Sequence, residues 1–153
     1  NELIETGYDE RLTRFGENYL AKKNGKFGVI NFESEPVISF NYDQITHWND
    51  SSLLVKKGPD YSVINRQEEP VTEPLESLRL ILKNDQQSIY RFIKDGKYGL
   101  VSNKYGTLLS SEYSDIFNIG TEEEPLFFAD QHLAKAGYHV VSYVNQKGEL
   151  ILS

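Results

Sequence analysis

The sequence predicts an all-β fold made of antiparallel β-meander repeats of about 34 residues. Three observations predict it. A ten-residue motif recurs along the chain, its centre holds residue pairs that close tight hairpins, and the flanking segments are rich in strand-forming residues. The motif reads KKNGKFGVIN at 22–31, KKGPDYSVIN at 56–65 and KDGKYGLVSN at 94–103. We expect the repeats to stack as a solenoid-like or open propeller-like array.

The centre of each motif predicts a hairpin. Asn24-Gly25 and Asp95-Gly96 favour a type I′ turn, because both central residues of that turn need a positive φ. In the second copy Pro59 follows Gly58. Since proline fixes φ at about −65°, it excludes that turn, and we expect a looser hairpin there.

A glycine follows the aromatic residue of the motif in two copies, as Gly28 and Gly99. A glycine inside a strand usually marks a bulge or the close approach of another backbone. Ser62 and His139 stand at this position in the other copies, so we expect the approach to be looser there and the array to be irregular.

Each motif is followed by a polar turn, a short apolar run and a Tyr-Asp-x-Ile-like phrase, clearest at 42–45 and 113–116. Tyr8-Asp9 looks like the tail of an earlier repeat, so the array is expected to begin within a repeat. We predict a single domain, 1–153, with a partial repeat at 1–18 and repeats at about 19–52, 53–85, 86–120 and 121–153. The last is the least regular, as end repeats commonly are.

These residues resemble the bacterial WG-repeat family over nearly the whole chain. The resemblance rests on the Lys-x-Gly-Lys-aromatic-Gly segments at 23–28 and 94–99 and on the phrase at 42–45. Phe or Tyr replaces the family's Trp in every copy, and Asn31, Asn65 and Asn103 stand where Asp is usual. The resemblance implies a repeat fold, no general catalytic activity, and a bacterial envelope, secreted or toxin-associated setting.

The composition excludes several classes of function. The chain has no cysteine, which excludes disulfides, thiolate metal sites and cysteine nucleophiles. With 16 Lys and Arg against 23 Asp and Glu, the net charge of −7 opposes binding to nucleic acids and favours a basic or neutral protein partner. No segment reaches the roughly 18 apolar residues that cross a bilayer, so we expect no membrane insertion. The compartment stays open between a secreted or periplasmic protein after signal removal and a cytoplasmic immunity protein.

A search for chemistry predicts no enzyme, no cofactor and no metal site. His47, His132 and His139 are the only imidazoles, and none lies in a known catalytic or metal-binding motif. A metal site at His132, His139 and Asp130 is outweighed by ordinary surface or loop histidines. Several glutamates fall in equivalent turns of successive repeats, which predicts solvated loop tips and not a catalytic pair: Glu33, Glu35, Glu68 and Glu69.

Two connectors carry the candidate partner contacts. The lone Trp48 follows His47 in a polar connector, and we expect its indole to cover the edge between two repeats, with a binding hot spot as the alternative. In the longest connector an acidic cluster precedes two phenylalanines. A solvated loop leading into the next strand is the preferred interpretation, and docking of a basic partner is the alternative. The candidate contacts there are Glu122, Glu123, Glu124, Phe127 and Phe128.

The sequence therefore predicts a non-enzymatic module that mediates protein–protein interaction. A narrower hypothesis is an immunity-type protein that neutralises a bacterial toxin through its acidic loops. A third is binding of carbohydrate or envelope glycan, because ten tyrosines and one tryptophan recur along the chain. The oligomeric state is left open.

Overall fold

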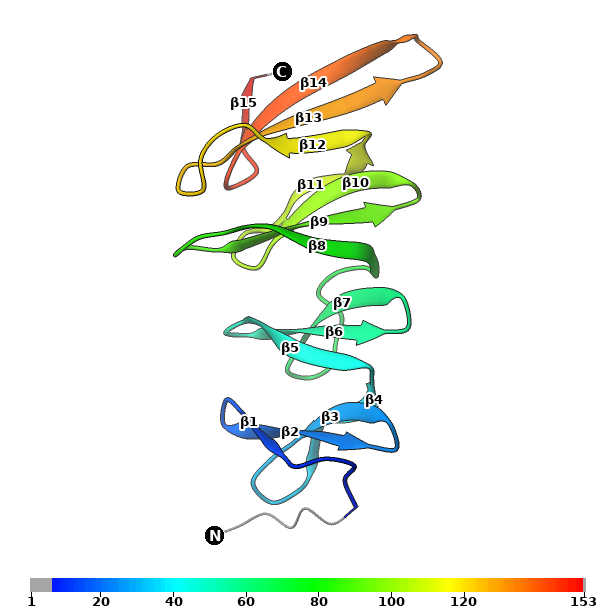
Figure 1. The fold of residues 1–153 in the computed structure, drawn as a ribbon, viewed down its shortest axis with the longest axis vertical. Helices are drawn as coiled ribbons and strands as arrows, with labels where there is room; N and C mark the ends of the chain where they lie inside the picture. Colours follow the sequence, from blue (N-terminus) through cyan, green and yellow to red (C-terminus); the bar gives the residue numbers. More distant parts are fainter. Residues whose placement is uncertain (1–6, 153) are drawn as a thin grey trace. The chain divides into compact units, whose positions relative to one another are not determined.

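The computed structural model describes residues 7–152. Within this range the chain forms fifteen β-strands and no helix, and the strands pair antiparallel (Figure 1). The all-β, antiparallel prediction is thus confirmed. The chain divides into two compact units, which we call unit 1 (residues 1–74) and unit 2 (residues 75–153).

Unit 1 contains two meanders, in which strands pair in chain order. The first runs through β1 to β4 and the second through β5 to β7, with a single bridge between Ile64 and Pro70 where a fourth strand would lie. The strands are β1 (Thr13–Phe15), β2 (Asn18–Lys23), β3 (Lys26–Ile30), β4 (Pro36–Tyr42), β5 (Gln44–Asn49), β6 (Ser52–Lys57) and β7 (Asp60–Asn65).

Unit 2 contains two further meanders, β8 to β11 and β12 to β15. The strands are β8 (Leu75–Lys83), β9 (Ser88–Lys94), β10 (Lys97–Ser102), β11 (Gly106–Tyr113), β12 (Asp115–Asn118), β13 (Leu126–Leu133), β14 (Tyr138–Asn145) and β15 (Leu150–Leu152).

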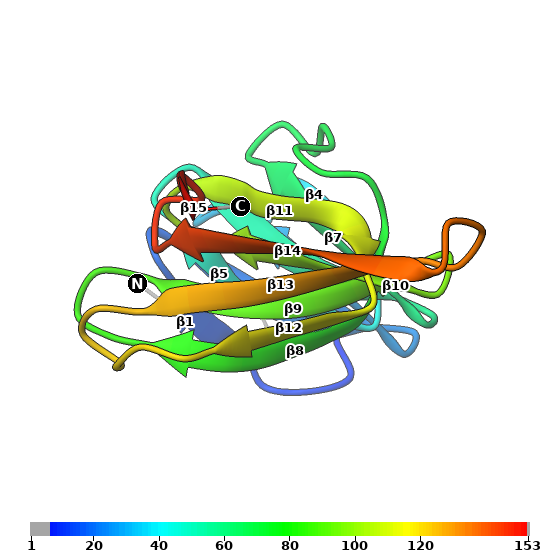
Figure 2. The same cartoon turned by 90° about the horizontal axis from the view of Figure 1, so that it is seen from above.

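Each unit buries a core between its two meanders, because alternate side chains of a strand point to one face. Figures 1 and 2 show β12–β15 lying over β8–β11 in this way. The buried cluster of unit 1 comprises Val29, Ile38, Ile45, Leu53, Val55 and Ile64. That of unit 2 comprises Leu82, Ile89, Leu100, Leu108, Leu109, Ile116, Phe127, Ala129 and Val144.

The hairpins at the centres of the motifs close in two residues. Asn24-Gly25 has φ of 52° and 81°, and Asp95-Gly96 has φ of 52° and 79°, as a type I′ turn requires. The looser hairpin expected at Gly58-Pro59 is wrong, since Lys57 still pairs directly with Asp60. Gly58 alone supplies the positive φ, 63°, so Pro59 occupies a position that does not need one.

The aspartate of the Tyr-Asp phrase caps the turn of the hairpin that follows it. Asp9 accepts a hydrogen bond from the Gly25 amide at 2.7 Å, and Asp43 accepts one from the Gly58 amide at 2.8 Å. Asp43 also accepts a bond from Lys26 Nζ at 2.6 Å. The bonds from Lys26 and from the Gly58 amide hold the pKa of Asp43 below its usual value. The phrase therefore links consecutive hairpins.

Close approach of a neighbouring backbone explains the strand glycines. A Cβ on Gly28 would lie 2.8 Å from the Ile38 carbonyl oxygen, and one on Gly99 would lie 2.8 Å from that of Leu109 and 2.5 Å from Phe92 Cζ. The pairing register shifts opposite both glycines, as in a β-bulge. The predicted bulge and close approach are both confirmed.

In the described part of the chain no backbone runs beside His139 on the β15 side, because β15 pairs only with Tyr143 and Val144 of β14. Ser62 differs, since the chain after β7 runs back beside it: the Val71 amide donates to the Val63 carbonyl at 2.7 Å, and Pro70 bridges to Ile64. A missing neighbour therefore accounts for the side chain at His139 but not for the one at Ser62.

The closing residue of the motif organises the turn that follows. Asn31 Oδ1 accepts bonds from the amides two and four residues further on, and Asn65 does the same. In the third copy the corresponding residue is Ser102, whose hydroxyl accepts bonds from the amides two and three residues on. The residue equivalent to Asn31 is therefore Ser102, and not Asn103 as the sequence predicted.

Candidate functional site

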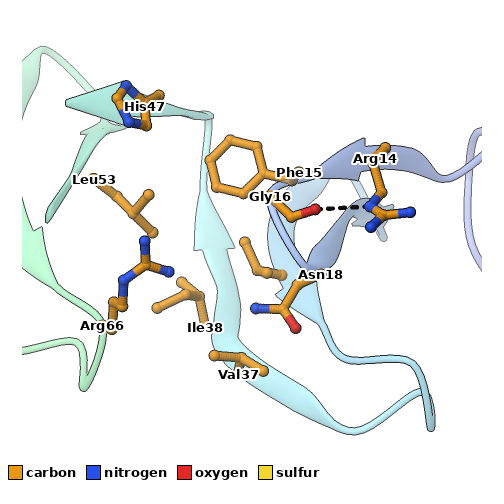
Figure 3. Close-up of a pocket in the computed structure, with 10 residues that line it drawn as sticks. Arg14, Phe15, Gly16, Asn18, Val37, Ile38, His47, Leu53 and Arg66 are labelled. Carbon is orange, nitrogen blue, oxygen red and sulfur yellow. Dashed lines mark hydrogen bonds between the residues drawn. The ribbon is translucent and has the colours of Figure 1, made fainter. Parts of the chain in front are cut away.

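A pocket of about 200 Å³ opens between the two meanders of unit 1 (Figure 3). Its floor is apolar and belongs to the buried core, and its rim is polar and exposed. It has no aspartate or glutamate among its lining residues, which are Arg14, Phe15, Gly16, Asn18, Val29, Val37, Ile38, His47, Leu53 and Arg66.

The two arginines of the rim come from opposite sides of the pocket. Arg14 follows the start of β1, its Nε donates to the Gly16 carbonyl at 2.7 Å, and its guanidinium lies 5.7 Å from the Tyr19 ring centre. Arg66 follows β7 and donates from Nη2 to the Asp50 carbonyl at 2.8 Å. Within residues 7–152 neither guanidinium makes an ion pair with a carboxylate. Both cations are therefore positioned by backbone oxygens and retain further N–H donors.

Unit 2 has the same strand register at the corresponding position, but its described residues leave no such opening. His47 pairs with Leu53 across β5–β6, as Asn118 pairs with Phe127 across β12–β13. Phe127 is 0% exposed, so the larger ring fills the space beside it. The unit 1 position holds the smaller Leu53 and remains open.

The first meander shows a parallel difference. Phe15 pairs with Asn18 across β1–β2, and Leu82 pairs with Ile89 across β8–β9. Ile89 is fully buried, whereas its unit 1 counterpart is the amide Asn18 on the pocket wall. By the same pairing, Arg14 lies opposite Tyr19 where unit 2 pairs the exposed Leu80 with Tyr90, and Ile81 is an extra residue at a register shift.

A longer connection closes the corresponding position of unit 2. Only two residues join Phe15 to Asn18 in unit 1, but six join Leu82 to Ile89 in unit 2. The longer connection carries Gln87, whose buried side chain donates to the Gln146 carbonyl at 3.0 Å and accepts a bond from the Ser102 hydroxyl. The short connection of unit 1 therefore lacks the residue that covers this position in unit 2.

Glu68 ties the loop that carries Arg66 to β4. Its carboxylate accepts bonds from the Ser39 amide at 2.8 Å, the Ser39 hydroxyl at 2.6 Å and the Tyr42 hydroxyl at 2.8 Å. Its backbone adopts a left-handed φ of 66°, which is uncommon for a side chain other than glycine. The expectation of a solvated loop tip is wrong for this glutamate, because its carboxylate bridges the two meanders of unit 1.

These contacts shift two pKa values. Burial raises the pKa of Tyr42 to about 12, and its hydrogen bond to the Glu68 carboxylate adds to that shift. Burial also acts to raise the pKa of Glu68, but the bonds from Ser39 and Tyr42 outweigh it, and the net pKa lies below its usual value. At neutral pH the pair is therefore a carboxylate accepting from a neutral phenol.

The structure separates the first two candidate contacts. Trp48 lies inside β5, not in a connector, and is only 5% exposed, so its indole is not presented to a partner. Burial agrees with the preferred expectation that the ring packs against its own chain. His47, one residue earlier, is exposed and lines the pocket.

The second group of candidates is also divided. Glu122, Glu123 and Glu124 lie exposed in the loop before β13, and Asn84 Nδ2 donates to the Glu122 carbonyl at 2.8 Å. Phe127 belongs to the core and cannot contact a partner in this fold.

Phe128 points to the opposite face of β13 and is partly buried. Its ring centre lies 6.2 Å from that of Phe117 and 5.7 Å from that of Tyr143. Of the two phenylalanines that were candidate contacts, only Phe128 keeps an accessible surface.

His132 and His139 face each other across β13 and β14. Their rings stack with centres 4.4 Å apart, and Asp130 bonds to His139 Nδ1 at 2.8 Å. They therefore lie on strands and not in a loop. Among residues 7–152 no three or more histidine, cysteine or acidic side chains gather in a way that could hold a metal ion.

Comparison with protein-family models, with curated proteins and with solved structures finds no match for this chain. In the described part of the chain no helix is long and apolar enough to cross a membrane.

The sequence analysis missed most of the pocket. Arg14, Asn18 and Arg66 belong to no motif and lie in weakly patterned segments. The signal that could have found Asn18 is the alignment of the copies, in which it stands at the position of Ile89. A polar residue at a position that is apolar in another copy indicates that the core is not closed there.

Proposed function

We propose that the chain consists of degenerate copies of one β-meander repeat of the WG type, stacked as a solenoid-like or open propeller-like array. The recurring local hydrogen bonds support this proposal. The bonds that Asp9 and Asp43 make to the following hairpin have a counterpart at Ser114, whose hydroxyl accepts a bond from the His132 amide of β13 at 3.1 Å. The Asn31 turn recurs at Asn145 with the same two acceptor bonds.

We further propose that this array is a non-enzymatic binding module that holds a protein partner at the pocket of unit 1. The observation that carries the proposal is the contrast between the units, because the same position is filled by a packed core in one and holds a pocket with an apolar floor in the other. A pocket with an apolar floor and a few polar groups at its rim is a common feature of recognition sites. The rim holds guanidinium, amide and imidazole groups but no carboxylate, a set suited to recognition.

Peptide display tests this function for a partner of any sequence. A random heptapeptide library is selected on the immobilised chain and counter-selected on Leu53→Phe, which installs the residue that fills unit 2. We expect the retained peptides to share an apolar residue and to lose about tenfold or more in affinity on Leu53→Phe, because the ring removes the space for that residue.

The chain offers a matched control and a second filling variant. Leu54→Phe places the same ring one residue along β6 on the opposite face, where unit 2 has Phe128, and should leave peptide affinity unchanged. Asn18→Ile fills the pocket from β2 with the residue found at Ile89. If the enriched peptides bind the wild type and both filled variants equally, the pocket is not the site.

A second candidate function is neutralisation of a basic toxin by the acidic loop of unit 2. Glu122, Glu123 and Asp85 line a second, polar hollow together with one cation, Lys83, so that acidic groups outnumber basic ones there. A basic protein would gain Coulomb attraction there, and its affinity should fall with salt. Reversing the charges of Glu122 to Glu124 should abolish such binding, and binding unaffected by salt and by the reversal would rule it out.

A further inference from the structure

We propose that the pocket of unit 1 recognises a carboxylate joined to a single compact apolar group, presented by a segment of the partner protein. The inference rests on the proposed binding function and specifies its ligand. It is carried by the size of the pocket, the Arg66 guanidinium of its rim and the residues at the same positions in unit 2.

The size of the pocket selects one side chain. A cavity of about 150 Å³ lined by aliphatic residues accommodates benzene, and this pocket measures about 200 Å³. Val29, Ile38 and Leu53 form an apolar floor that is buried in the rest of the fold. A phenyl or branched aliphatic group fits this space, and a drug-sized ligand does not.

The charge of the rim selects an anion. Arg66 is anchored by the Asp50 carbonyl oxygen and keeps N–H groups that no carboxylate of residues 7–152 pairs with. The Arg14 side chain lies over Tyr19, on the face of β1 opposite Phe15 (Figure 3). The chain has seven more acidic than basic side chains, yet none of the acidic ones lines this pocket. A guanidinium pairs best with a planar carboxylate, through two parallel hydrogen bonds. In an unmodified protein the anion is a carboxylate, either of an Asp or Glu side chain or of the C-terminus.

The fold does not require a cation at the position of Arg66. Unit 2 carries Gln146 there, in a turn with the same pattern of hydrogen bonds. Arg66 therefore gives unit 1 a charge that unit 2 lacks at this position.

Matched acid and amide probes test the charge requirement. The probes are 3-phenylpropionate and its amide, acetyl-Ala-Ala-Phe with a free or an amidated C-terminus, and acetyl-Asp-Phe-amide with its Asn analogue. Binding is followed by NMR titration of the ¹⁵N-labelled chain. We expect the acid of at least one peptide pair to bind about tenfold more tightly than its neutral analogue, and the difference to shrink at high salt. The pair that shows it identifies a chain end or an acidic side chain as the source, whereas a difference confined to phenylpropionate overturns the protein-borne ligand.

Two substitutions separate charge from shape. Arg66→Gln introduces the residue of unit 2 and should remove most of the acid preference while the neutral probes keep their affinity within about twofold. Arg79 is exposed on β8 of unit 2, so Arg79→Gln should change neither the acid preference nor the affinity of the neutral probes. Leu53→Phe should abolish binding of every probe.

The outcomes distinguish this inference from the function beneath it. If the acids and the amides bind equally and both are lost in Leu53→Phe, the pocket binds partners but the carboxylate requirement is wrong. If no probe binds, the inference is overturned, and the display selection decides whether the pocket binds any peptide. If acid preference survives in Arg66→Gln, the Arg66 guanidinium is not the receptor.

Discussion

Unit 1 and unit 2 place the same strands around the same position of the fold, yet unit 1 leaves a pocket there and unit 2 fills it. The backbone pairing is shared, since Val29 pairs with Ile38 as Leu100 pairs with Leu109. Unit 1 has the smaller Leu53 in place of Phe127 and the polar Asn18 in place of Ile89, and its connection is too short to hold a counterpart of Gln87. A position that is packed in unit 2 is thus open in unit 1, although these residues pair in the same way.

This opening has a thermodynamic cost. Full burial of an aliphatic side chain contributes about 1.5–3 kcal/mol, and unit 1 forgoes that contribution at Asn18 relative to Ile89. Natural proteins commonly give up stability at sites that bind. We therefore expect the pocket position of unit 1 to tolerate loss of side-chain volume better than the same position of unit 2.

Truncation of the paired residues gives the largest expected effect. Phe127→Ala should destabilise unit 2 by about 3–5 kcal/mol, because a fully enclosed ring leaves a cavity that its neighbours cannot fill. Leu53→Ala should cost unit 1 only about 2 kcal/mol, since one side of Leu53 already faces the pocket. Amide hydrogen exchange in β13 and β14 measures the destabilisation caused by Phe127→Ala.

Trp48 fluorescence during urea unfolding measures the second, because the one tryptophan of the chain is buried in unit 1. Equal losses at the two positions would mean that the pocket is as tightly packed as the core of unit 2, and the contrast between the units would fail.

The backbone framework could be predicted from the sequence because its signals are local. Asn-Gly and Asp-Gly pairs fix turns by their φ preferences, and the strand glycines report a neighbouring backbone through the missing Cβ. The hairpin at Gly58-Pro59 was mispredicted because proline excludes only one of the two-residue turns, and glycine at the first position admits another.

The site could not be predicted in the same way, because it depends on which side chains meet across sheets. Phe127 reads as an exposed aromatic beside an acidic loop, but alternation along β13 turns it into the core and leaves Phe128 on the other face. Arg66 and Arg14 lie 52 positions apart in the sequence and reach one pocket only through the packing of two meanders. Long-range packing of this kind carries no short motif.

A smaller effect tests whether the framework itself is the same in both units. Gly28→Ala and Gly99→Ala should each cost about 2 kcal/mol, because the added Cβ would meet a carbonyl oxygen at 2.8 Å in either case. Ser62→Ala should stay within about 0.5 kcal/mol, since Ser62 already carries a Cβ at that position. Chemical denaturation of each variant measures these differences. A cost confined to one of the two glycines would show that the units differ in backbone as well as in side chains.

The smallest effect concerns the acid dependence of unit 1. The counterpart of Glu68 in unit 2 is Gly148, which has the same positive φ and no side chain, so this position makes a carboxylate bridge in unit 1 alone. Glu68→Gln should lower the unfolding free energy of unit 1 by about 1 kcal/mol at pH 7, because charge-assisted bonds to Ser39 and Tyr42 are weakened.

The sign of the pH dependence follows from the two pKa shifts. The folded-state pKa of Glu68 lies below its ordinary value of 4.5, so its contribution is complete above that pH and is lost as the pH falls through the folded pKa. The pKa of Tyr42 is raised to about 12, so its contribution is complete below its ordinary pKa of 10.0 and is lost as the pH rises through the folded value. The difference between wild type and Glu68→Gln, followed by Trp48 fluorescence, should therefore be constant at intermediate pH and shrink in acid and in strong base. If the difference persists unchanged at pH values well below the folded-state pKa of Glu68, the carboxylate charge does not hold the Arg66 loop against β4.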